Sequence, residues 1–156
     1  MAIQKQEFYE GAALHQLIRG VGDVRVRFAP PFFVLDERLQ VHLKYSTATR
    51  SPWGFTFNPD EQQLLLKRSA ELPLAIGLVC GADGIAVLSF DQYASIARPR
   101  STGIRVACFR KHREHFEITG PDGGIPRKVP PSDWQRLLNN RPKNEDEAQR
   151  SSSQSA

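Results

Sequence analysis

Cysteine is scarce in this sequence. Its 156 residues include two cysteines, Cys80 and Cys108, and both lie inside apolar runs. The spacing of cysteine and histidine residues that is typical of zinc sites is missing. We therefore predict two reduced thiols buried in a core, in place of a disulfide framework or a metal site.

Long apolar runs are also missing. No run approaches the roughly 20 residues that a helix needs to cross a bilayer. The first ten residues, MAIQKQEFYE, lack the basic start and the apolar middle of a signal peptide. These features predict a cytoplasmic protein that has no contact with a membrane.

Two common catalytic and binding motifs are not found. No serine or cysteine has a partner histidine and acid at a recognisable spacing, so a hydrolase triad has no support. Gly120, Gly123 and Gly124 belong to a predicted turn that no helix follows directly. A glycine loop that binds phosphate is therefore not expected there.

The composition is that of a folded protein. With 40% hydrophobic residues, the chain fits one α/β domain with a core of ordinary size. We assign residues 1–140 to this domain. Residues 141–156 are too polar to fold alone, so we predict that they form a disordered tail.

Positive charge is concentrated in one segment. The formal net charge is +4, and residues 98–128 carry eight Lys and Arg side chains against three acids. A basic segment of this kind attracts phosphate backbones. The alternative is a sheet edge kept basic to prevent aggregation.

Apolar periodicity predicts a helix and then three strands. The helix is expected over residues 6–19, where Gly20 and Gly22 end it. The strands are expected over residues 24–28, 32–35 and 39–45, and the last two form a hairpin. The first strand should have one buried and one basic face, because its apolar residues alternate with arginines.

A second helix and a buried strand follow. Asn58 as the N-cap, Pro59 as the first helical residue and Glu61 as the partner in a capping box predict a helix over residues 58–69. Residues 74–80 are apolar without alternation. That pattern is typical of a strand that is covered on both faces and central in a sheet.

The remaining sequence predicts added strands and short helices. Strands are expected over residues 85–89, 104–109 and 115–119. Short helices are expected after Ser89, paired with Gln92, and after Ser132, paired with Gln135. The prediction is therefore a single α/β domain with a mixed β-sheet, an αβββαβ core, and extra C-terminal strands and short helices.

Two of the predicted elements carry side chains of the types found at catalytic sites. Because side chains alternate along a strand, His42 and Lys44 share one face of the third strand. Glu10 lies four residues before Leu14, on or beside the inward stripe of the first helix. A carboxylate at that position is solvated, paired or functional.

With Glu10 on the first helix, Asp36 on the hairpin and Lys44 on its second strand, this order of elements resembles the restriction-endonuclease-like PD-(D/E)xK nuclease superfamily. The resemblance covers about residues 6–81, half of the chain. It implies hydrolysis of phosphodiester bonds. Asp36 would help to hold Mg²⁺, Glu10 would assist, and Lys44 would orient or activate the attacking water.

The motif departs from that of the superfamily at two places. Position 42 should hold an acid or a glutamine, but it holds His42, a soft ligand that suits Mg²⁺ badly. Asp36 lies at the turn, whereas Lys44 lies six residues past Arg38, about 20 Å along an extended strand. Phe32 or a neighbour stands where an acid is expected. We predict a nuclease-like domain that interacts with nucleic acid and has lost catalysis. An active Mg²⁺-dependent endonuclease is the alternative.

Basic and aromatic residues outside this motif favour nucleic-acid binding. Arg50 and Trp53 offer a phosphate contact beside a stacking surface. Arg110, Lys111 and Arg113 offer further phosphate contacts. The alternating aromatics that begin at Trp53 are also typical of a buried strand, so a core role is the alternative for this residue.

A different class of function is also consistent with the sequence. A small accessory module would bind another protein through the Trp53 loop or through the sheet edge near His115, without a role in nucleic-acid binding. The sequence carries no signal of the oligomeric state.

Overall fold

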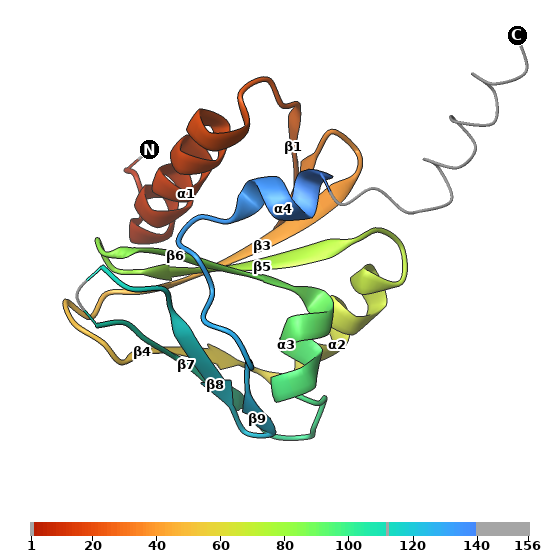
Figure 1. The fold of residues 1–156 in the computed structure, drawn as a ribbon. Coiled ribbons are helices and arrows are strands. Elements are labelled where there is room, and N and C mark those ends of the chain that lie inside the picture. Colours follow the sequence, from red (N-terminus) through yellow and green to blue (C-terminus); the bar gives the residue numbers. More distant parts are fainter. Residues whose placement is uncertain (1, 112, 140–156) are drawn as a thin grey trace, which may run out of the picture.

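The computed structural model describes residues 2–111 and 113–139, and Figure 1 shows their arrangement. The predicted tail, residues 141–156, lies outside the described residues, as does residue 112. The described residues form four helices and nine strands, and the strands make two sheets. Within them, no helix is both long and apolar enough to cross a membrane.

The larger sheet is mixed and has five strands in the order β1-β2-β3-β5-β6. Its strands are β1 (Val26–Ala29), β2 (Phe32–Leu35), β3 (Leu39–Ser46), β5 (Leu74–Cys80) and β6 (Gly84–Ser89). Strands β3 and β5 are parallel, and the other neighbours are antiparallel. A parallel pair needs a long crossover, because the chain must return to the same end of the sheet. Strand β4 (Trp53–Phe57) and helix α2 (Pro59–Ser69) make this crossover.

The smaller sheet is antiparallel and has the order β4-β7-β8-β9. Its other strands are β7 (Ile104–Phe109), β8 (Glu117–Gly120) and β9 (Gly123–Gly124). The remaining helices are α1 (Lys5–Val21), α3 (Phe90–Ile96) and α4 (Trp134–Asn139). The predicted α/β domain with a mixed sheet and added C-terminal elements is therefore confirmed.

The larger sheet has a core on each face. Helices α1 and α4 cover one face, where Ala13 and Leu17 pack with Val41 and Leu43. The smaller sheet, α2 and α3 cover the other face, as Figure 1 shows. Helix α2 and helix α1 therefore lie on opposite sides of β3.

Strand β5 confirms the prediction of a doubly covered strand. All seven of its residues are buried. It lies between β3 and β6, so β3 rather than β5 is the middle strand of the sheet. Gly77 in β5 leaves room for α4, because a Cβ there would lie 2.9 Å from the indole of Trp134. Trp134 is buried, as predicted.

Strand β1 differs from its prediction. The sequence predicts one buried and one basic face, but Val26 is 39% exposed and Phe28 is 60% exposed. The reason is position, because β1 is the edge strand beside β2. Alternation alone does not tell whether another layer covers a strand.

One of the two predicted capping boxes of the C-terminal half is confirmed. The hydroxyl of Ser89 accepts from the backbone N–H of Gln92, whose side chain accepts from the backbone N–H of Ser89. The hydroxyl of Ser132 donates to the side chain of Gln16 on α1, at 2.6 Å, and α4 begins two residues later. The side chain of Gln135, the predicted partner of Ser132, lies outside the described part of the structure.

Candidate functional site

The polar face of β3 points toward α2. The side-chain amide of Gln40 donates to the carbonyl oxygens of Arg68 and Leu72, at 2.8 and 3.2 Å. His42 and Lys44 continue this face toward the N-terminus of α2. The opposite face of β3 packs on α1. The predicted sharing of a face by His42 and Lys44 is confirmed.

Lys44 is held in place by three kinds of contact. Its Nζ lies 3.0 Å from each carboxylate oxygen of Glu61. It also donates to the carbonyl oxygen of Thr56 at 2.6 Å. The ammonium lies 4.8 Å from the centroid of the Phe57 ring, which is within the range of a cation–π contact.

His42 contacts the same carboxylate. Its Nε2 lies 2.8 Å from Oε2 of Glu61, and its side chain is buried. Because a carboxylate only accepts, Nε2 carries the proton in this hydrogen bond. The other ring nitrogen, Nδ1, is buried without a partner in the part of the chain that the structure describes.

His42, Lys44 and Glu61 form one cluster of side chains, the Lys44 cluster, in which Glu61 is the acid. The sequence predicts another role for Glu61. Asn58 accepts from the backbone N–H of Glu61 at 2.8 Å, as predicted, but the Glu61 carboxylate turns to the sheet instead of closing a capping box. Burial acts to raise the pKa of Glu61. Hydrogen bonds from His42 and Lys44 outweigh burial and lower this pKa, so the carboxylate is charged at neutral pH.

An open groove of about 530 Å³ lies beside the Lys44 side chain. Gln6 from α1 lines one side of it, and Asp60 and Glu61 from α2 line another. Apolar groups also line the groove, among them Leu43 and Tyr45 of β3. The groove therefore joins the polar face of β3 to the start of both long helices.

Glu10 lies close to this groove but outside the cluster. It is on α1, and its carboxylate accepts from the side-chain amide of Gln6 at 2.7 Å. Gln6 lines the groove and Glu10 does not. Within the described residues, no hydrogen bond or ion pair joins Glu10 to Lys44 or Glu61.

Asp36 lies at the other end of β3. Its Oδ1 accepts from the backbone N–H of Arg25 at 2.8 Å, in the turn between β2 and β3. From Leu39, where β3 begins, to Lys44 is about 17 Å along an extended strand. The structure therefore does not bring Asp36 and Lys44 together.

The donor atoms around Lys44 do not fit Mg²⁺. Phe32 is the direct partner of His42 in the β2–β3 register, where the superfamily would have an acid. The cluster offers one carboxylate, on Glu61, and one imidazole. Among the described residues, no group of three or more His, Cys, Asp or Glu side chains is placed to hold a metal ion. Mg²⁺ needs several oxygen ligands in a near-octahedral arrangement.

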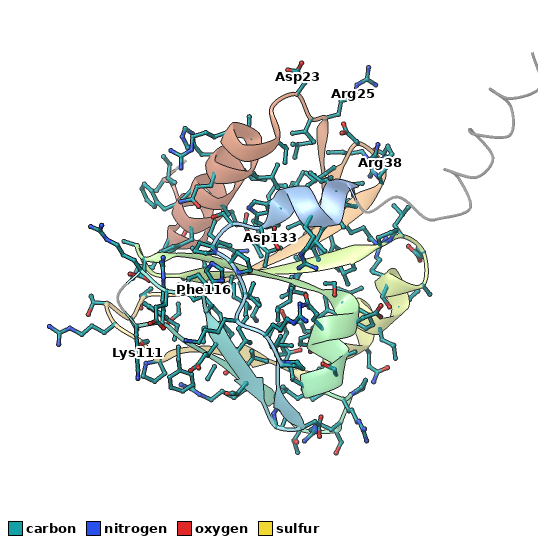
Figure 2. The ribbon with its side chains drawn as sticks, in the orientation of Figure 1. Asp23, Arg25, Arg38, Lys111, Phe116 and Asp133 are labelled. Atoms are coloured by element: carbon teal, nitrogen blue, oxygen red, sulfur yellow. The ribbon has the colours of Figure 1, made fainter. Side chains whose placement is uncertain are left out.

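Two distant segments meet near the C-terminal end of β3. The hydroxyl of Ser51 donates to the carbonyl oxygen of Arg110 at 3.3 Å, which joins the β3–β4 loop to the β7–β8 loop. The two loops carry exposed cations at Arg50, Lys111 and Arg113. None of the three forms an ion pair with a described carboxylate. We call these three residues the basic end, and Figure 2 labels Lys111 there.

Arg110 is used differently from its neighbours. Its guanidinium donates to the backbone and the carboxylate of Asp83, at 2.8 and 3.0 Å, and to the carbonyl oxygen of Glu114 at 2.7 Å. It also lies 5.0 Å from the ring of Phe116. Arg110 therefore fixes the base of the β7–β8 loop and is not free for phosphate, in contrast to its prediction.

Trp53 belongs to the core. Only 2% of it is exposed, so its indole is not accessible to a base. The indole N–H donates to the carbonyl oxygen of Ala48 at 2.9 Å. The alternative that placed the alternating aromatics in the core is therefore the one that the structure supports. Trp53 holds the loop that carries Arg50.

No protein-family model, curated protein or solved structure matches the chain. The resemblance to the nuclease superfamily therefore depends on the order of the elements and on Lys44.

Proposed function

We propose that this protein binds nucleic acid through the basic end, on a nuclease-like core that does not cut. The observation that carries the proposal is the contact between the loop that carries Arg50 and the loop that carries Lys111 and Arg113. These residues are about 60 positions apart in the sequence, and the contact between Ser51 and Arg110 joins their loops.

The charge of the basic end suits a phosphate backbone. Two nearby cations are paired: Arg110 binds Asp83, and Lys128 binds Glu114. Arg50, Lys111 and Arg113 are exposed and have no described carboxylate as an ion-pair partner. Exposed, unpaired cations release counterions when they bind phosphates, which favours association at low salt.

The core of the fold supports the nuclease-like part of the proposal. Helix α1, strands β1 to β3, helix α2 and strand β5 follow the αβββαβ order once β4, an inserted strand of the smaller sheet, is set aside. Strand β5 is parallel to β3. Lys44 lies near the C-terminal end of β3, the same end from which the chain enters the loop of Arg50.

The contacts of the Lys44 cluster favour binding of nucleic acid over its hydrolysis. Lys44 is already paired with the one carboxylate that contacts it. That carboxylate and His42 do not make a Mg²⁺ site, so we derive no hydrolytic step from them.

Salt dependence tests the proposal. Labelled DNA or RNA should bind at low salt, and its affinity should fall steeply as salt is added. Arg50→Ala, Lys111→Ala and Arg113→Ala should each weaken binding and reduce the salt slope by about 1. Arg25→Ala is the matched control, because Arg25 is also exposed and lies far from Lys111 in Figure 2. Absence of binding at low salt would overturn the proposal.

The protein-binding alternative has less support at its predicted surfaces. Trp53 is buried, so it offers no contact to a partner. Strand β8, which follows His115, is paired on one side with β7 and on the other with β9. A paired strand has no free edge to which a partner strand adds.

A further inference from the structure

Phe109 is an exposed aromatic next to the basic end. In β7 the side chains of Ile104, Val106 and Cys108 are buried in the core. Phe109 has the opposite orientation, and it is 39% exposed. The chain then passes directly into the loop that carries Lys111. An exposed aromatic ring, that of Phe109, therefore lies two residues from the exposed cation of Lys111.

A pocket of about 320 Å³ lies against Phe109. Ser51 of the β3–β4 loop lines it, together with Lys111 and His115 of the β7–β8 loop and Lys128. Pockets for small ligands begin at roughly 300 Å³. The pocket is therefore large enough for one nucleotide and far too small for a duplex.

The carboxylates in this pocket are paired. Lys128 Nζ lies 2.8 Å from Glu114 and 3.8 Å from Glu117. The hydrogen bond from Lys128 to Glu114 raises the pKa of Lys128, so the pair stays charged at neutral pH. Lys128 therefore offsets one of the two carboxylate charges, and Lys111 adds a further positive charge to the lining of the pocket. Arg50 and Arg113 lie outside this lining.

We propose that Phe109 is a stacking platform for an unpaired base, so that the preferred ligand is a single-stranded nucleic acid. This inference rests on the proposed function, because the basic end would hold the phosphates on either side of the stacked base. A ring beside a basic groove is a recurring arrangement in proteins that bind single strands. Bases in a duplex are stacked on each other, and their faces are not accessible to Phe109.

The test compares a single strand of about 12 nucleotides with a duplex of the same length. Phe109→Ala should weaken binding of the single strand by roughly 5- to 150-fold, the effect of about one lost stacking contact. Binding of the duplex should stay unchanged. Phe28→Ala is the matched control, because Phe28 is a more exposed aromatic on the edge strand β1 and should have no effect.

Two further variants separate stacking from folding. Phe109→Leu keeps an apolar side chain at the same position and should lose affinity like Phe109→Ala, with an unchanged melting temperature. Phe109→Trp should retain affinity, and its added fluorescence should be quenched when the single strand binds. The two natural tryptophans are buried, at 1% and 2% exposure, so they supply a steady background.

The possible outcomes distinguish this inference from the proposed function. If neither ligand binds at low salt, the proposed function fails and this inference fails with it. If both ligands bind and the Phe109 variants bind as tightly as the wild type, Phe109 is no stacking platform, although the basic end still binds phosphates. Equal losses for the single strand and the duplex would also overturn the preference for single strands.

Discussion

The ammonium of Lys44 lies 3.0 Å from both carboxylate oxygens of Glu61, and so ties the middle strand of the large sheet to the first turn of α2. His42 binds the same carboxylate at 2.8 Å. The side chain of Glu61 is 15% exposed, so the pair is screened less by solvent than a surface ion pair. Removing either partner leaves a partly buried charge without its counterion.

Glu61 should make stability depend on pH in the acid range. Its pKa is lowered in the folded protein, so its charged form stabilises the fold at pH values above its unfolded pKa of about 4.3. That contribution is lost as the pH falls through the folded pKa. Denaturant unfolding from pH 7 to pH 3 should show a steep loss for the wild type. Glu61→Gln should be less stable at pH 7 and have a shallower acid slope.

A matched control for Glu61→Gln is Glu37→Gln. Glu37 pairs with Arg27 at 2.7 Å, but both side chains are more than half exposed. Exposed pairs contribute little, because water and salt screen them. Glu37→Gln should therefore follow the wild-type curve closely. If Glu61→Gln also ran parallel to the wild type at all pH values, the stabilising role of the cluster would be wrong.

Divalent metal ions should neither stabilise the protein nor enable it to cleave DNA. Because the cluster offers one carboxylate and one imidazole, Mg²⁺ at millimolar concentration should leave the melting temperature unchanged, and a plasmid incubated with the protein and Mg²⁺ should stay supercoiled. Chelator is the control for metal carried through purification. Nicking that disappears in Lys44→Ala and Glu10→Ala would instead support the active endonuclease that the sequence leaves open.

Gly81→Ala should disturb the loop that carries Arg50. Gly81 has a φ of +54°, and a Cβ there would lie 2.5 Å from the carbonyl oxygen of Ala48. That oxygen accepts from the indole of Trp53. The substitution should cost about 1–3 kcal/mol of unfolding free energy and weaken nucleic-acid binding. Denaturant unfolding and a salt titration measure the two effects.

The control for this prediction is Gly11→Ala on α1. A Cβ at Gly11 meets no atom within 4 Å, and the residue is helical. Alanine there should stabilise the protein by roughly 0.5–1 kcal/mol and leave binding unchanged. Equal behaviour of the two variants would contradict the role of Gly81 in positioning the loop.

The local signals in the sequence predict most of the fold. Alternation along β3 predicts that His42 and Lys44 share a face, and the register opposite Phe32 is confirmed. The helix over residues 58–69 begins at Pro59, with Asn58 as its N-cap. These features are decided by neighbours in the chain, so a single sequence contains them.

The candidate site depends on contacts between distant segments, and these are harder to predict. Glu61 has the spacing of a capping box, but its carboxylate instead binds the side chains of His42 and Lys44 on β3. Trp53 and Phe109 both lie in alternating strands, and alternation does not tell which face a second layer covers. The sequence therefore leaves both a stacking role and a core role open for Trp53, and the structure buries Trp53 and exposes Phe109.

The two cysteines should be unreactive in the folded protein. Cys80 and Cys108 are fully buried and free. The neighbouring thiol of Cys108, and then burial, raise the pKa of the Cys80 thiol, and the thiolate is the reactive form. Iodoacetamide should modify neither cysteine in buffer, and both after unfolding in guanidinium, as counted by mass spectrometry. Leu66→Cys is the positive control, because Leu66 is 44% exposed on α2. Rapid modification of the native wild type, or a mass loss that indicates a disulfide, would contradict the predicted pair of buried, reduced thiols.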